Sequence, residues 1–167
     1  MGQPKITEIE AQLGEWEFLK ELPQEIDGFK LTMGQGIEGQ ILTIASYSNE
    51  AMHSRLDLIY TSETFDYVPV KTIGMHTFRD IRYFCRDRDK FAKMMHEKLP
   101  ELLEDVNREK QHQMGTLIEE AGLLNWAYSG KLPQKIGAFE LYITPDNPID
   151  YINGSTLFID YSDFEHG

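Results

Sequence analysis

One phrase occurs twice in the chain and constrains its fold more than any other feature. Residues 16–31 read WEFLKELPQEIDGFKL, and residues 126–141 read WAYSGKLPQKIGAFEL. The two align without a gap at an offset of 110 residues, and seven of the sixteen positions are identical. In both, a Leu-Pro pair follows the tryptophan, and the residue before a proline is pushed out of the α-helical region. The phrase is therefore predicted to join a helix to a β-strand.

The similarity continues beyond the phrase. The pattern Ile-x-Gly-x-x-Leu-x-Ile occurs at residues 37–44 and again at residues 152–159, at an offset of 115. The second copy therefore has five extra residues, which we assign to the loop TPDNPIDY at residues 144–151. Each copy predicts a helix, a turn and two strands. We infer an internal α-β-β duplication, with units at about residues 5–48 and 102–162.

The remaining periodicity predicts an α+β fold. Apolar spacing indicates helices at residues 5–21, 88–98 and 102–128, with Pro100 either kinking a helix or starting one. Alternating residues predict strands at 29–33, 40–47, 55–61, 67–73, 80–86, 132–143 and 155–161. Pro69 suggests an edge position for the strand that contains it. We expect a single domain over residues 1–167. It should have one antiparallel sheet of about six or seven strands, with both hairpins in it and helices packed on one face.

Composition narrows the class of protein. The apolar fraction of 41% is ordinary for a globular chain, and no apolar run is long enough for a membrane span. The N-terminal residues lack the apolar segment of a signal peptide, and Cys85 is the only cysteine. The net charge of −12 argues against nucleic acid and anionic membranes as partners. We expect a soluble cytoplasmic protein, with Cys85 a buried, inert thiol on its strand.

The charge is distributed unevenly along the chain. Residues 79–98 hold seven Lys and Arg against four acidic residues. One interpretation is a solvated face with internal ion pairs. The other is a basic patch in which Arg82, Arg86 or Arg88 holds an anionic ligand. A small enzyme would then need a titratable group beside them, and we name His53, His76 and Cys85 as the candidates.

No residue is assigned to catalysis, metal binding or a cofactor. No two histidines lie three or four residues apart, as a zinc-binding helix requires. The glycine pattern at residues 34–39 resembles a dinucleotide fingerprint but lies between two predicted strands rather than before a helix. The oxygen-rich loop at 144–151, with Asp160 and Asp163 nearby, lacks the spacing of a calcium loop.

Three functional hypotheses follow. The leading one is a non-catalytic, acidic interaction protein of the chaperone or toxin-neutralising type, because the repeated residues are scaffold and the reactive side chains are scattered. The second is a small enzyme or anionic-ligand binder with its site near residues 79–98. The third is self-association through an open sheet edge or a helix.

Overall fold

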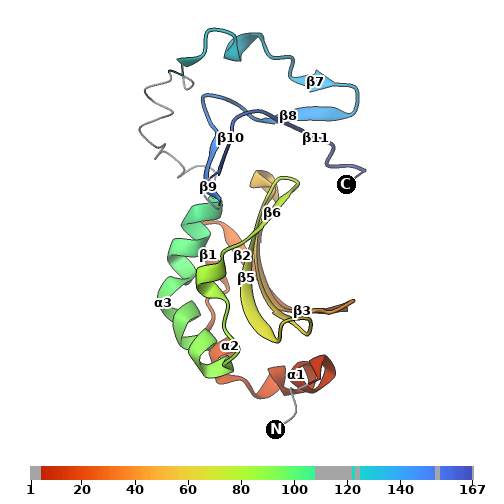
Figure 1. The fold of residues 1–167 in the computed structure, drawn as a ribbon, viewed down its shortest axis with the longest axis vertical. Helices are drawn as coiled ribbons and strands as arrows, with labels where there is room; N and C mark the ends of the chain where they lie inside the picture. Colours follow the sequence, from red (N-terminus) through yellow and green to blue (C-terminus); the bar gives the residue numbers. More distant parts are fainter. Residues whose placement is uncertain (1–4, 108–121, 123–124, 153–154, 167) are drawn as a thin grey trace.

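The computed structural model describes residues 5–107, 122, 125–152 and 155–166. Figure 1 shows an antiparallel sheet with one long helix along its face, and a smaller group of strands at one end. The first part of the chain forms α1 (Ile6–Gln12), the 3-10 helix η1 (Leu13–Glu15), α2 (Glu17–Glu21), β1 (Glu25–Ile26), β2 (Phe29–Glu38), β3 (Ile41–Asn49) and the 3-10 helix η2 (Glu50–Met52). It continues through β4 (Ser54–Thr61), β5 (Asp66–Ile73), β6 (His76–Arg79), the 3-10 helix η3 (Ile81–Tyr83) and α3 (Arg88–Val106). The second part forms the 3-10 helix η5 (Ser129–Lys131), β7 (Lys135–Ile136), β8 (Phe139–Ile143), β9 (Ile149–Ile152), β10 (Ser155–Leu157) and β11 (Asp160–Ser162).

The single helix predicted for residues 5–21 is divided at Trp16. This residue adopts an extended backbone, with φ −84° and ψ 101°, between η1 and α2. Its ring is only 5% exposed and lies 5.2 Å from the ring of Phe18 and 5.8 Å from that of Tyr67. Burial of the indole thus outweighs the local preference for an unbroken helix.

The main sheet is a meander of six strands in the order β1-β2-β3-β4-β5-β6, which confirms the α+β class. The strands predicted at 55–61 and 67–73 appear as β4 and β5. β5 is not an edge strand, because β6 pairs with its second half. Pro69 is tolerated there because it lies between the bridge at Tyr67 and the first β6 pair at Val70, so no neighbour on that side needs its missing N–H.

The prediction of a strand at residues 80–86 is wrong. The pairing segment is β6, and residues 81–83 form η3 instead. The side chain of Asp80 accepts a hydrogen bond from the backbone N–H of Arg82 at 3.0 Å, a local contact that competes with sheet pairing. Cys85 makes an isolated bridge with Tyr67 and is partly rather than fully buried. Its thiol donates to the carbonyl oxygen of Asp87 at 3.3 Å.

Helix α3 supplies the other half of the main core. The carboxylate of Asp87 caps it by accepting from the N–H of Lys90 at 2.8 Å, and the helix continues through Pro100 without a break. Its buried side chains join those of β3, β4 and β5 in one cluster: Phe91, Met95, Leu99, Leu102, Leu103 and Val106. The predicted helix at 102–128 falls largely on residues 108–121 and 123–124, which lie outside the described residues. Among the described residues, no helix is long and apolar enough to cross a membrane.

The second hairpin does not join the main sheet, contrary to the prediction of one sheet. Its strands form a three-stranded sheet, β11-β8-β7, and a two-stranded sheet, β10-β9. The loop at 144–151 explains the split, because Thr144 and Asn147 pair across a tight turn that ends β8 after five residues. In the first hairpin, by contrast, β2 runs for ten residues, through a bulge between Met33 and Gly36. We call residues 125–166 the C-terminal unit.

The two copies of the phrase nevertheless share their local structure. The N–H of Leu31 donates to the carbonyl of Gln24 at 2.9 Å, and that of Leu141 donates to Gln134 at 2.9 Å. The strand register is also the same, as β1 pairs Ile26 with Phe29 and β7 pairs Ile136 with Phe139.

A tyrosine from the closing strand secures each joint in the same way. Tyr47 of β3 donates its hydroxyl hydrogen bond to the carbonyl of Pro23 at 2.7 Å, and Tyr161 of β11 donates to Pro133 at 2.8 Å. The position of β11 beside β8 therefore corresponds to that of β3 beside β2.

Candidate functional site

The three arginines singled out by the sequence lie near the start of α3 and already face carboxylates. Arg82 makes a two-pronged contact with Asp80, with its Nε 2.9 Å from Oδ2, and this hydrogen bond holds the pKa of Asp80 below its ordinary value. The Nε of Arg86 lies 3.6 Å from a carboxylate oxygen of Asp66. These contacts are the internal ion pairs that the first interpretation expects.

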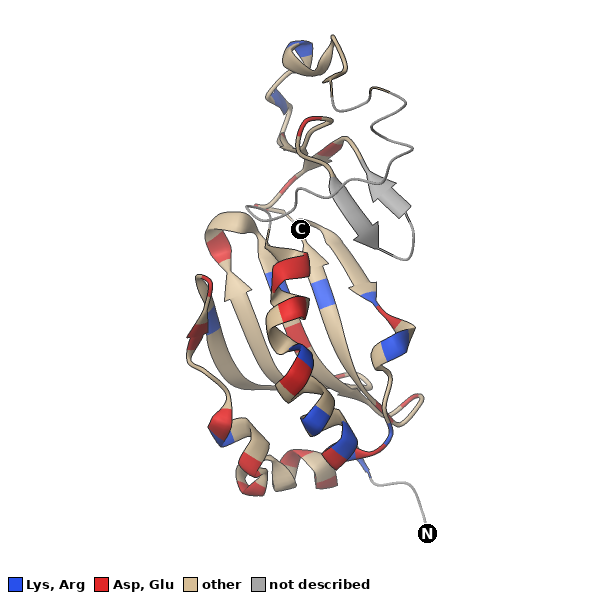
Figure 2. Ribbon diagram, turned by 90° about the vertical axis from the view of Figure 1, so that its left-hand side faces the viewer, with Lys and Arg blue, Asp and Glu red and all other residues tan. Residues whose placement is uncertain are grey.

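Arg88 lies against the buried ring of Trp16, although its own side chain is 40% exposed. Its guanidinium carbon lies 5.7 Å from the centre of the Trp16 ring, and its Nε lies 3.6 Å from a carboxylate oxygen of Asp89. Figure 2 shows Lys and Arg interspersed with acidic residues on the first part of α3, and acidic residues alone toward its C-terminal end. Binding of an anion by Arg82, Arg86 or Arg88 remains a prediction.

The two central histidines, in contrast, both meet the C-terminal unit. His53 follows η2 in the left-handed conformation, and its ring stacks on that of Phe164 with centroids 3.8 Å apart. His76 begins β6, and its Nε2 lies 3.0 Å from Oδ1 of Asp160. The main sheet thus holds the C-terminal unit through histidines on two neighbouring turns.

Tyr142 of β8 completes this junction. Its hydroxyl donates to the carbonyl of Met52, and its ring lies over Gly74. A Cβ atom at Gly74, whose φ is +59°, would lie 2.6 Å from Cε1 of Tyr142. The close approach therefore depends on glycine in the turn between β5 and β6.

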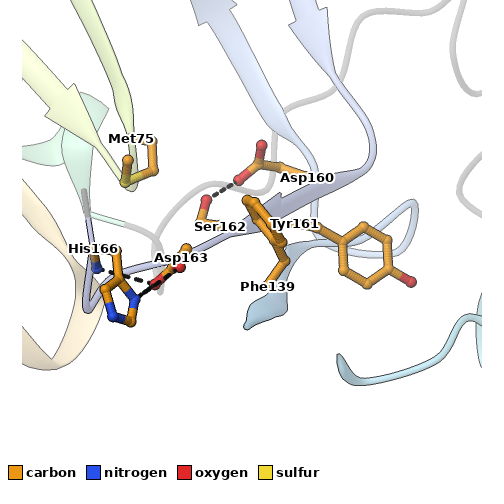
Figure 3. A pocket seen from close by; sticks show the side chains of 7 residues that line it. All are labelled: Met75, Phe139, Asp160, Tyr161, Ser162, Asp163 and His166. Carbon is orange, nitrogen blue, oxygen red and sulfur yellow. Dashed lines mark hydrogen bonds and ion pairs between the residues drawn. The ribbon is translucent and has the colours of Figure 1, made fainter. Parts of the chain in front are cut away.

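A pocket of about 380 Å³ opens beside this junction (Figure 3). We call it the junction pocket. Its lining residues come from the turn before β6, from β8, from β11 and from the segment after β11: Met75, Phe139, Asp160, Tyr161, Ser162, Asp163 and His166. The volume lies at the lower end of the range of small-ligand sites, about 300–1,000 Å³.

The polar groups at the pocket do not have the arrangement of a Ser-His-Asp triad. The hydroxyl of Ser162 donates to Asp160, and His76 contacts the other oxygen of the same carboxylate. In a Ser-His-Asp triad the imidazole stands between the other two groups and takes the proton of the serine. Here the carboxylate stands in the middle, so His76 has no contact through which to activate Ser162.

A second carboxylate is held at the mouth of the pocket. Burial raises the pKa of Asp163, but hydrogen bonds from the side chain of His166 and from the backbone N–H groups of Glu165 and His166 outweigh it and lower the pKa below its ordinary value. The Nδ1 of His166 lies 3.0 Å from Oδ2 of Asp163. The pocket therefore presents two carboxylates, Asp160 and Asp163, on a partly apolar lining.

The repeated phrase differs most in what covers it. Trp16 is 5% exposed and Phe29 is fully buried, whereas their counterparts Trp126 and Phe139 are 38% and 51% exposed. The ring pair itself is retained, because Trp126 and Tyr128 lie 5.6 Å apart as Trp16 and Phe18 do at 5.2 Å. We call Trp126, Tyr128, Ile136 and Phe139 the second-copy apolar surface.

The oxygen-rich loop at residues 144–151 is built by turn contacts. The N–H of Asn147 donates to the carbonyl of Thr144 at 3.0 Å, and the hydroxyl of Ser129 donates to Asp146 at 2.9 Å. This hydrogen bond from Ser129 lowers the pKa of Asp146. Within the described residues, no group of three or more His, Cys, Asp or Glu side chains is placed to hold a metal ion.

Sequence reasoning missed most of the junction pocket. It named Asp160 and Asp163 as loop oxygens and His53 and His76 as a possible pair, but it did not connect them. One signal was present in the sequence, because Phe139 of the second copy aligns with Phe29 of the first, and Tyr161 with Tyr47.

No protein-family model, curated protein or solved structure matches this chain.

Proposed function

We propose that this chain is a non-catalytic cytoplasmic interaction protein that binds a protein partner through its C-terminal unit. The observation that supports it is the unequal burial of one phrase. Phe29 is 0% exposed and Phe139 is 51% exposed, although both occupy the same strand register. Exposed aromatic and aliphatic side chains, here Trp126, Tyr128, Ile136 and Phe139, are typical of protein-binding surfaces.

The first copy of the phrase shows which contacts cover the tryptophan when it is buried. There, Trp16 is covered by the ring of Tyr67 on β5 and by the guanidinium of Arg88 on α3. A partner would supply equivalent cover to Trp126 and Phe139. We further infer that the two α-β-β units arose by duplication, because the Leu-to-Gln and Tyr-to-Pro hydrogen bonds recur at corresponding positions. An acidic binder of the chaperone or toxin-neutralising type fits this arrangement.

The test is a pull-down from native lysate with the tagged full chain at low and moderate salt. The wild-type protein should retain a stoichiometric protein partner, and the double variant Trp126→Ser/Phe139→Ser should lose it. Phe84→Ser is the matched control, because Phe84 is an aromatic residue of the main body that is 39% exposed. Absence of any stoichiometric partner, or equal loss in the control, would contradict the proposal.

A further inference from the structure

Strand β11 has an open edge where its counterpart has a neighbour. In the main sheet β3 pairs with β2 on one side and with β4 on the other, and Tyr47 lies opposite Leu56 of β4. In the C-terminal unit β11 pairs with β8 and ends the order β11-β8-β7, so among the described residues no strand occupies the position of β4. The free N–H and C=O groups of an edge strand are a template for an added strand.

The junction pocket lies beside this edge. Phe139 and Tyr161 line it, and they correspond to Phe29 and Tyr47, which are both fully buried. In the first unit the apolar side chain of Leu56, also fully buried, lies opposite the tyrosine. A strand added to β11 in the register of β4 would place its corresponding side chain opposite Tyr161, at the pocket. Figure 3 shows Met75 across from β11, on the far side of the space.

The charge at this edge selects the partner. Residues 158–166 contain Asp160, Asp163 and Glu165 and no lysine or arginine, and Lys135, which acts on Asp163, is itself paired with Glu140 at 3.1 Å. The chain as a whole carries a net charge of −12, so a second copy would meet like charge. A different protein that offers lysine or arginine beside its apolar residue meets opposite charge instead.

We propose that the partner adds an extended, positively charged strand to the open edge of β11 and places an apolar side chain in the junction pocket. This inference rests on the proposed function and specifies how the partner is held. Main-chain hydrogen bonds to β11 supply the pairing, the pocket selects an apolar residue, and Asp160 and Asp163 select flanking cations.

The probe is a capped synthetic peptide with the sequence of β4, residues 54–61, carrying the change Asp57→Lys, which makes its charge +2. The isotope-labelled full chain is titrated with it and followed by amide chemical shifts and hydrogen exchange. We expect the shifts to centre on residues 160–162, with slower exchange of β11 amides. Phe139→Ser should weaken binding more than tenfold, as expected for a central apolar anchor. Phe84→Ser should leave it unchanged.

Two further arms isolate pairing and charge. The same peptide with Leu56→Pro should not bind, because proline cannot donate a ladder hydrogen bond. The unmodified β4 peptide, which keeps Asp57, should bind more weakly at low salt, and the difference should shrink as salt rises.

Several results would overturn the inference. These are no binding at about 1 mM peptide, shifts centred on β3 as the peptide replaces β4, equal binding to Phe139→Ser, and light scattering that shows a dimer held through β11. The pull-down and the peptide titration separate the two proposals. A lysate partner lost in the double variant, together with no peptide binding at β11, leaves the proposed function standing and removes only the strand mechanism.

Discussion

The two phenylalanines of the repeated phrase offer a direct comparison of one residue in two environments. Phe29 is 0% exposed within the main core, and Phe139 is 51% exposed at the junction pocket. Truncation of a buried phenylalanine costs about 3–5 kcal/mol, because transfer free energy is lost and a cavity remains. For Phe139 about half of a transfer term of about 1.5–3 kcal/mol applies, and water fills the space, so we expect a loss of about 1 kcal/mol.

Urea unfolding of Phe29→Ala and Phe139→Ala, followed by far-ultraviolet circular dichroism at pH 7, measures this difference. With an m-value of about 2 kcal/mol/M, the midpoint should fall by about 2 M for Phe29→Ala and by about 0.5 M for Phe139→Ala. Phe84→Ala, a change at a residue 39% exposed, is the control for truncation of a surface ring. Its midpoint should move about as little as that of Phe139→Ala.

Equal losses for the two substitutions would refute the reasoning. Phe139 would then belong to a packed core, and the second-copy apolar surface would not be free to bind a partner. A rise in stability for Phe139→Ala would be compatible with the reasoning, because removal of an exposed ring from a binding surface often relieves a site kept for function.

Three further experiments test the tyrosine hydrogen bond of the first copy, the close approach at Gly74 and the three arginines. Burial raises the pKa of Tyr47 to about 12. The contribution of the neutral phenol to the free energy of unfolding is therefore complete below the unfolded pKa of about 10 and is lost as pH rises to about 12. Tyr47→Phe should lower the free energy of unfolding by about 1 kcal/mol at pH 7, because the hydrogen bond to Pro23 is lost. Between pH 10 and 12, the urea midpoint of this variant should fall by less than that of the wild type. Gly74→Ala should destabilise the junction by more than Gly34→Ala, since both have positive φ but only Gly74 faces a ring, and thermal melts of the pair measure the difference. If the three arginines serve only as ion pairs, titration with inorganic phosphate should give the same result for the wild type and for Arg82→Gln, Arg86→Gln and Arg88→Gln. Saturable phosphate binding that is lost in any of these variants would favour the anion site.

The candidate site could be predicted only in pieces. The sequence identified His53, His76 and Asp160 as chemistry-bearing residues, but the contact between His76 and Asp160 joins positions 84 residues apart. Such a pair depends on where β6 and β11 lie in space, and no local pattern encodes this. The wrong prediction of a strand at residues 80–86 has a local cause. A hydrogen bond from the N–H of Arg82 to the side chain of Asp80 stabilises a turn there, despite the alternating pattern of the sequence.

The sequence by itself determined the joint. Leu-Pro-Gln followed by alternating apolar residues produces the same turn and register at both positions, because these depend on residues close in the chain. The tyrosine hydrogen bond also recurs, although β9 and β10 lie between β8 and Tyr161 in the second copy. Only the tertiary structure decided how deeply each copy of the phrase is buried. Phe29 shares one core cluster with side chains from β3, β4, β5 and α3, whereas Phe139 lies in the separate β11-β8-β7 sheet and is 51% exposed. Burial depends on the surface that distant segments supply, so two phrases that share seven of sixteen residues differ in exposure, with Phe29 in the core and Phe139 51% exposed.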